Sequence, residues 1–235
     1  MLSEKQKQEL KNRYERVRQN IEEAAQKANR EPDDIKLIVV GKKQPLKKIM
    51  YVSNLGVHAC AESRVQELRE KEEQATERIN WHFVGHLQRN KVKYLARMDD
   101  CSLIHSLDSE RLAREIDKRA AKNNRILSAL VQVNVAKDEN KFGLMPEELL
   151  SYLEVVEKFD NINIEGLMTL VPYFEDCEET RPFFKKLFEL RQKALDRGFD
   201  LPELSMGMTN DYEVAIEEGA TMIRLGREIF GPRNY

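Results

Sequence analysis

Short apolar runs and amphipathic stretches alternate along most of the chain. The first thirty residues predict one amphipathic helix that Pro32 ends, with apolar side chains at three- and four-residue steps, at Leu10, Tyr14, Val17, Ile21, Ala24 and Ala28. Beyond it, eight runs rich in β-branched residues predict strands at 36–41, 57–60, 81–85, 102–107, 128–135, 162–170, 203–206 and 221–226. Helical patterns fall between them, at 63–74, 109–122, 146–158, 180–197 and 211–218.

These runs are too uniformly apolar for a half-exposed sheet, so they indicate parallel strands covered by helices. Eight strands in 235 residues predict a closed (β/α)8 TIM barrel that occupies residues 1–235 as a single domain. The alternative is a doubly wound open sheet, which favours a glycine-rich fingerprint where this chain has Gly41-Lys42-Lys43-Gln44-Pro45. The chain ends nine residues after the last predicted strand, so we expect helix 1–30 to pack on the barrel in place of the final helix.

Composition and charge narrow the class of protein further. With 39 basic against 41 acidic residues and a net charge of -2, the chain has no signature of nucleic-acid or polybasic membrane binding. No apolar run approaches the roughly 20 residues of a membrane span. Cys60, Cys101 and Cys177 lie far apart without zinc spacing, which favours free thiols in a reducing compartment. We therefore expect a soluble, cytoplasmic protein.

The candidate chemistry lies where the predicted strands end, because TIM barrels carry their sites at the carboxyl ends of the strands. Lys42 follows the first apolar run, beside Lys43. A lysine amine desolvated at the barrel mouth becomes a nucleophile that can form a Schiff base. The alternative is that Lys42 only solvates the top of a strand.

The last two strand ends point to a bound anion. Ser205, Gly207 and Thr209 follow the seventh predicted strand and Gly226-Arg227 follows the eighth, the loops that hold phosphate in many TIM barrels. Each could instead be a plain turn. Arg224 lies on the eighth strand, where it needs a partner: a ring nitrogen, a carboxylate or a structural ion pair. Pyridoxal 5'-phosphate (PLP) suits the set, since it has an aldehyde, a phosphate and a pyridine nitrogen.

Several longer motifs make the chain resemble a known family. They are Leu37-Ile38-Val39-Val40-Gly41-Lys42, Ala61-Glu62-Ser63-Arg64-Val65-Gln66-Glu67, Trp81-His82-Phe83-Val84-Gly85-His86-Leu87-Gln88-Arg89-Asn90-Lys91, Gly166-Leu167-Met168-Thr169, Leu204-Ser205-Met206-Gly207-Met208-Thr209 and Arg224-Leu225-Gly226. Together they resemble the PLP homeostasis protein family, the single-domain relatives of the alanine racemase N-terminal barrel. The resemblance extends from about residue 36 to residue 235.

The resemblance implies a role for individual residues. Lys42 would form the Schiff base, Ser205, Gly226 and the backbone of Arg227 would hold the phosphate, and Arg224 would face the pyridine nitrogen. Ser63, Met168 and Thr209 are further candidates at the strand ends. Two departures from the family pattern put cofactor affinity in question: Gly41-Lys42-Lys43 stands where Ser-Lys-Thr is usual, and Ala61-Glu62-Ser63 where Gly-Glu-Asn is usual.

Binding PLP need not mean catalysis. A guanidinium opposite the ring nitrogen disfavours the protonated ring that best stabilises a carbanion. The related racemases also use a tyrosine base and a further domain, whereas this chain ends at Tyr235. We therefore expect a monomeric protein of PLP homeostasis that holds the cofactor and passes it to apo-enzymes, with little or no turnover.

Two other functions remain open from the sequence. One is a PLP-dependent amino-acid racemase or related enzyme. The other is a nucleic-acid or protein-interaction module, for which the basic stretch from His86 to Arg97 is the best support. Asp99 and Asp100 follow that stretch and aromatic residues are sparse in it, so a solvated helix face explains it more simply.

Overall fold

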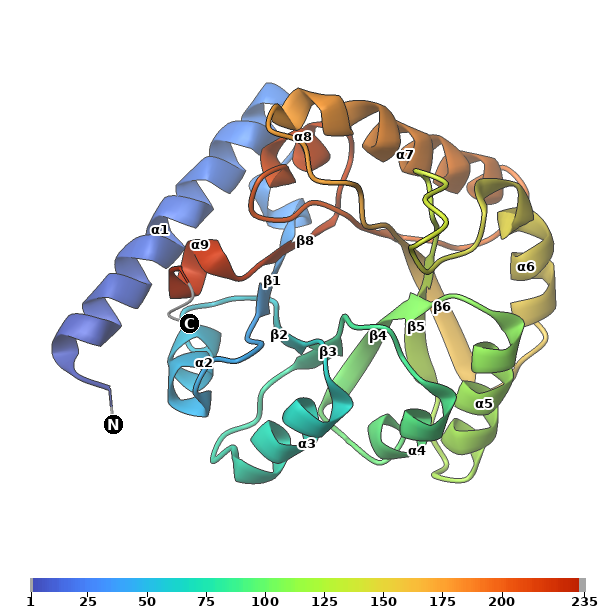
Figure 1. The fold of residues 1–235 in the computed structure, drawn as a ribbon, viewed down its shortest axis with the longest axis horizontal. Coiled ribbons are helices and arrows are strands. Elements are labelled where there is room, and N and C mark those ends of the chain that lie inside the picture. Colours follow the sequence, from blue (N-terminus) through green and yellow to red (C-terminus); the bar gives the residue numbers. More distant parts are fainter. Residues whose placement is uncertain (1, 233–235) are drawn as a thin grey trace.

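The structure, a computed structural model, describes residues 2–232; residue 1 and residues 233–235 of the predicted domain lie outside the described part. Eight parallel strands close into a barrel, in which β1 pairs with β2 on one side and with β8 on the other (Figure 1). The strands are β1 Lys36–Val40, β2 Ala59–Glu62, β3 Trp81–Phe83, β4 Cys101–Leu107, β5 Leu127–Gln132, β6 Ile162–Met168, β7 Glu203–Ser205 and β8 Met222–Leu225. The predicted TIM barrel is confirmed, and the open sheet is wrong.

Helices surround the strands (Figure 1). They are α1 Glu4–Lys27, α2 Leu46–Ser53, α3 Val65–Gln74, α4 Val92–Leu95, α5 Glu110–Ala121, α6 Leu149–Val156, α7 Arg181–Leu195, α8 Tyr212–Glu217 and α9 Arg227–Phe230. Short 3-10 turns occur at Pro32–Asp34, Arg89–Lys91, Pro146–Glu148 and Cys177–Thr180. None of the helices in the described part of the chain combines the length and the apolar character needed to cross a bilayer.

Two apolar layers explain the uniformly apolar strands. A small cluster inside the barrel includes Ile38, Leu130 and Met168, and a much larger one between strands and helices includes Leu37 and Val39. Alternate residues of one parallel strand therefore face two different cores.

Several predicted strands were too long. The run 128–135, for example, continues past the end of β5, and its Val133 and Val135 are buried outside the strand. The run 57–60 was also displaced, because β2 begins at Ala59 and continues to the buried Glu62. An apolar run in the sequence indicates buried residues, and residues in the loops at the barrel rim are buried as well as those in the strands.

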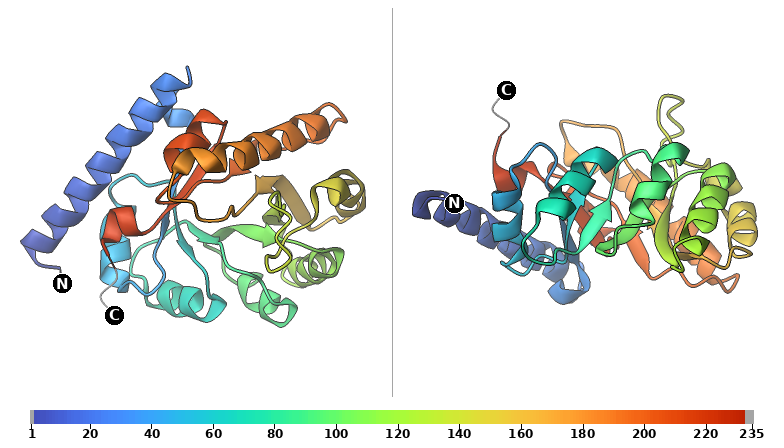
Figure 2. Two further views of the ribbon diagram at one scale, coloured as in Figure 1. Left: turned by 45° about the horizontal axis from the view of Figure 1, so that its top comes forward. Right: turned by 90° about the horizontal axis from the view of Figure 1, so that it is seen from below.

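The N-terminal helix lies along the outside of the barrel (Figure 2). A capping box between Ser3 and Gln6 begins α1, and its buried face packs mainly against α8 and α9. The Asn20 amide donates to the Tyr212 hydroxyl at 2.8 Å, and Arg30 donates to the carbonyl oxygen of Ile216 at 2.8 Å. Because α9 is a single turn, α1 covers the part of the outer ring that the eighth helix of a full barrel would cover.

Candidate functional site

A cavity opens at the carboxyl ends of the strands. The loops after β1, β6, β7 and β8 line it, and they contribute Lys42, Tyr173, Met208, Thr209, Arg224, Gly226 and Arg227 among other residues. This is the face on which TIM barrels carry their sites. The structure thus brings together Lys42, Arg224, Thr209 and the Gly226-Arg227 turn, all of which the sequence predicted as site residues.

Lys42 lies on the turn after β1, which ends at Val40. Its side chain is exposed. The turn carries Lys42 beyond the apolar end of the strand, and the desolvation predicted for its amine stays a prediction. What the turn provides is a fixed backbone: the Lys43 N–H donates to Glu67 Oε1 at 2.6 Å, and the Gly41 carbonyl accepts from Lys71 Nζ at 3.0 Å.

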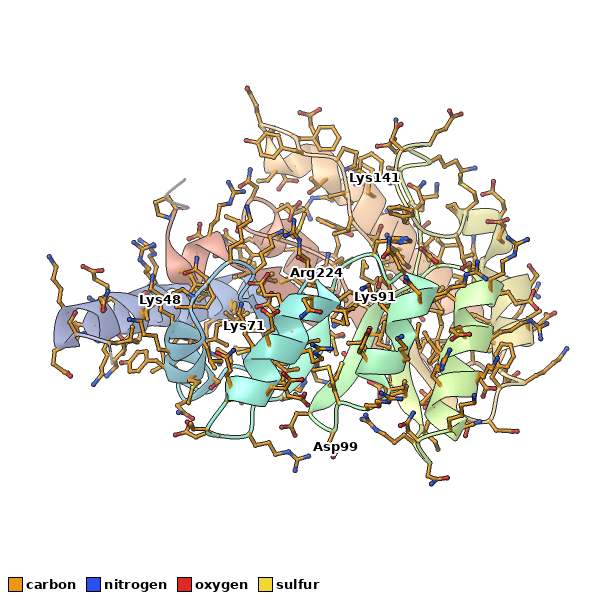
Figure 3. All side chains as sticks on the ribbon, turned by 60° about the horizontal axis from the view of Figure 1, so that its bottom comes forward. Lys48, Lys71, Lys91, Asp99, Lys141 and Arg224 are labelled. Atoms are coloured by element: carbon orange, nitrogen blue, oxygen red, sulfur yellow. The ribbon has the colours of Figure 1, made fainter. Side chains whose placement is uncertain are left out.

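Arg224 on β8 is 5% exposed and extends inside the barrel towards the cavity (Figure 3). Its Nη2 donates to the carbonyl oxygen of Thr169 at 2.8 Å and its Nη1 donates to Ser205 Oγ at 2.6 Å. Burial lowers the pKa of Arg224 to about 10, which leaves the guanidinium charged at neutral pH. Asp211 is near enough for its charge to favour the charged form of Arg224, while the hydrogen bonds that hold the guanidinium are those to Thr169 and Ser205.

Ser205 occupies a different place from the one expected. It is fully buried as the last residue of β7, and its hydroxyl bonds to Arg224 below the cavity. The loop reaches the cavity through Met208, Thr209 and Asn210. Gly207 makes the turn between Ser205 and Met208 at a φ of +90°. An added Cβ there would stand 2.6 Å from the Cβ of Ala215.

Two other predicted site residues, Met168 and Ser63, are also not among those that line the cavity. Met168 is 1% exposed and packs in the cluster inside the barrel. Ser63 is half-buried, and its backbone lies so close to Gly85 that an added Cβ there would stand 2.0 Å from the Ser63 carbonyl oxygen. The sequence places both residues near strand ends, but it does not indicate in which direction their side chains point.

A buried polar chain, which the sequence did not predict, crosses the barrel interior to Arg224. The Ser205 hydroxyl bonds to His105 Nδ1 at 2.9 Å, and His105 Nε2 bonds to His82 Nδ1 at 2.9 Å. A guanidinium only donates, so Ser205 accepts from Arg224. Which atom donates in the two histidine contacts depends on the tautomers of His82 and His105. This chain fixes the orientation of the Arg224 side chain from below.

We expect the two histidines to make the protein sensitive to mild acid. Burial lowers the pKa of His82 to about 3 and that of His105 well below its usual value. Below about pH 6.5 the unfolded chain binds protons at these two rings that the folded chain does not, so their contribution to stability falls as the pH falls. Glu62, whose pKa burial raises, contributes in the opposite direction. Between pH 7 and pH 5.5, His82 alone should cost about 1 kcal/mol of the free energy of unfolding. Denaturant unfolding at the two pH values, compared between wild type and a His82 variant, measures this loss.

A pair of matched variants separates this effect from general acid sensitivity. His82→Gln should flatten the pH dependence, since glutamine can accept from His105 and does not titrate. Gln88→Ala, at an exposed position without a titratable group, should keep the wild-type slope. An identical slope in wild type and His82→Gln would contradict the assignment.

The basic stretch from His86 to Arg97 has partners within the chain. The charged groups of Arg69, Lys91 and Lys93 lie 5.3, 5.7 and 5.0 Å from the centre of the Tyr94 ring. The His86 ring stacks on the partly exposed Phe142 at 3.6 Å between centroids. These contacts give basic side chains of the stretch partners within the chain; that it is a solvated helix face and not a nucleic-acid site stays a prediction.

The cysteines and metal ligands add no second centre. Cys60, Cys101 and Cys177 are free thiols, as the sequence predicted, and burial raises the pKa of Cys60 and of Cys101 to about 12. No group of three or more metal-ligating side chains comes together within residues 2–232.

The chain is similar to known proteins over most of its length. Residues 13–234 match the family model of the alanine racemase N-terminal domain. A pyridoxal phosphate homeostasis protein of Aquifex aeolicus is 46% identical over 95% of this chain and 98% of its own. One from Mus musculus is 32% identical over 91% of this chain and 84% of its own.

Solved structures extend the comparison. The PipY protein of Synechococcus elongatus with PLP bound is 30% identical, with a TM-score of 0.78 over 90% of this chain and 100% of that chain. An alanine racemase of Clostridium difficile has a TM-score of 0.75 over 92% of this chain and 58% of that chain. Its identity of 16% shows a shared fold only.

Proposed function

The chain belongs to the family of pyridoxal phosphate homeostasis proteins that match the alanine racemase N-terminal domain, and on that premise we propose that it binds PLP in the cavity at the carboxyl ends of its strands. The observation that carries the proposal is the convergence of Lys42, Arg224 and the two loops after β7 and β8 on that one cavity. A relative at 30% identity holds PLP on the same fold.

The residues present suit the three ends of this cofactor. Arg224 is a buried, fixed donor that would face the pyridine nitrogen. Lys42 supplies the amine that would bond to the aldehyde. Gly226 would offer its backbone to the phosphate from the cavity wall, at a position where a Cβ would stand 3.1 Å from the carbonyl oxygen of Val40 and so would have little room. In this proposal, Ser205 accepts a hydrogen bond from Arg224 and so holds the guanidinium in place.

The phosphate would meet backbone donors and one cation. Within residues 2–232, the N–H groups of Thr209 and Asn210 have no backbone or side-chain acceptor, although both residues line the cavity. Arg227 opens α9 directly after Gly226, beside them in the cavity wall. Backbone N–H groups and a guanidinium are the donors that recur in phosphate sites.

We further propose that the protein keeps and delivers PLP in the cytoplasm, as a monomer, and turns over little or no amino acid. PLP supplies an electron-withdrawing ring when bound, and that capacity is greatest when the ring nitrogen carries a proton. The charged Arg224 would oppose that proton. The curated relatives are named for PLP homeostasis, and the proposed recipients are PLP-dependent apo-enzymes.

Proton exchange at the α-carbon tests the proposal against its alternative, an amino-acid racemase. Protein loaded with PLP and incubated with a set of amino acids in deuterated water should exchange α-protons no faster than free PLP does. The exposed Tyr173 at the cavity is the group that could act as a base in the alternative. Exchange at enzyme-like rates that disappears in Lys42→Ala would favour the racemase.

A further inference from the structure

A buried charged cluster stands behind the turn that carries Lys42. Lys71 on α3 donates through Nζ to Glu62 Oε1 at 2.5 Å, to Glu67 Oε1 at 2.7 Å and to the carbonyl oxygen of Gly41 at 3.0 Å. Glu62 is fully buried at the end of β2, and Lys71 is 8% exposed where α3 lies beside α2 (Figure 3). Three acceptors thus match the three protons of one ammonium group.

The cluster holds the backbone on both sides of Lys42. The Gly41 carbonyl before it accepts from Lys71, and the Lys43 N–H after it donates to Glu67 Oε1 at 2.6 Å. Lys43 takes a φ of +62°, which a non-glycine residue adopts only when its surroundings enforce it. Gly41 also has no space for a side chain, since a Cβ would stand 2.6 Å from Ile49 Cδ1 and 3.0 Å from Glu62 Oε1.

We propose that Lys71, joined to Glu62 and Glu67, is a positioning residue that fixes the backbone of residues 41–43 and so directs the Lys42 amine into the cavity. The inference rests on the proposed function. It also explains how this chain places its lysine with Gly41 and Lys43 in the positions where the family pattern has hydroxyl residues.

The charges make the arrangement depend on Lys71. Burial raises the pKa of Glu62 to about 7, while the Lys71 ammonium and, to a smaller extent, the charge of Lys42 favour its charged form. Glu62 Oε2 is buried and has no hydrogen-bond partner within residues 2–232, so the hydrogen bond from Lys71 to Oε1 is the one that supports the carboxylate there. Removing the ammonium would leave Glu62 and the Gly41 carbonyl without their shared donor, and the turn would lose its support.

The proposal separates two parts of cofactor binding. A covalent bond would form between Lys42 Nζ and the aldehyde carbon of PLP, and the aldehyde oxygen would leave as water. This part depends on where the amine points. The phosphate contacts would come from the loops after β7 and β8 and the ring contact from Arg224 on β8, so neither would be supplied by the 41–43 turn. Pyridoxine 5'-phosphate has an alcohol in place of the aldehyde, so it reports the second part alone.

Lys71→Met is the decisive variant, with Lys47→Met on the exposed face of α2 as its matched control. Affinity for PLP should fall about tenfold or more in Lys71→Met, because small misplacements of a reacting group have effects of that size or larger. Borohydride trapping at Lys42 should fall with it. Affinity for pyridoxine 5'-phosphate should stay within about twofold of wild type, and Lys47→Met should match wild type in all three measurements.

Every other outcome counts against the positioning role. Equal losses for PLP and pyridoxine 5'-phosphate would make the cluster merely structural, and no loss for either would make it irrelevant. If Lys71→Met does not fold, Lys71→Met/Glu62→Gln removes both buried charges and should give the same result; failure of both to fold would assign the cluster to stability. Absence of trapping at Lys42 in wild type would overturn the proposed function itself, which is a different result.

Discussion

Replacing Lys42 by alanine should abolish covalent retention of PLP. Among the residues within 2–232 that line the cavity, Lys42 is the one with a primary amine, and it follows β1 by only two positions. The variant should lose the visible absorbance of the bound cofactor and release all PLP on denaturation. It should keep a weaker, reversible affinity from Arg224 and the loops after β7 and β8. Absorbance before and after gel filtration in denaturant measures both effects.

The neighbouring lysine provides the control. Lys43 does not line the cavity, and Lys43→Asn suits its position because asparagine tolerates a positive φ. This variant should retain PLP as wild type does. Loss of covalent PLP in Lys43→Asn with retention in Lys42→Ala would exchange the roles of the two residues and contradict the site.

Replacing Ile21 by alanine should destabilise the protein by about 2–5 kcal/mol, the usual cost of truncating a buried isoleucine. Ile21 is fully buried on α1, which packs against α8 and the short α9. For a domain of this size, that loss corresponds to a fall of roughly 10 °C in Tm. Thermal and denaturant unfolding of the whole chain measure it.

An exposed residue on α1 provides the control variant. Glu22 is exposed, so Glu22→Ala should leave Tm within about 1 °C of wild type. If Ile21→Ala also unfolded at the wild-type temperature, α1 would not be part of the cooperative fold. The place assigned to it beside α9 would then be wrong.

The barrel could be predicted because its strands are buried on both faces. Ile38 faces the interior while Leu37 and Val39 face the helices, so the whole run is apolar and stands out in the sequence. Strand ends could not be predicted as well. Val133 and Val135 are as buried in the loop as they would be in a strand, and hydrophobic pattern alone does not distinguish the two.

The candidate site was predictable where backbone position decides the outcome. Gly226 and Arg227 reach the cavity because they begin the turn after β8, whatever their side chains do. Ser205 and Met168 face the barrel interior but do not line the cavity, because the apolar pattern does not show how far below the barrel mouth an interior side chain lies. The links from Arg224 to Ser205 and from His105 to Ser205 join residues 19 and 100 positions apart, and no local pattern reveals them.

Borohydride reduction of the wild-type protein loaded with PLP, followed by peptide mapping, tests the central claim most directly. Reduction makes the bond between amine and cofactor permanent and marks the residue that formed it. We expect a single labelled peptide in which Lys42 carries the cofactor, with Lys43 and Lys71 unmodified. Labelling of a different lysine, or no stable label in protein that has bound PLP, would contradict the account.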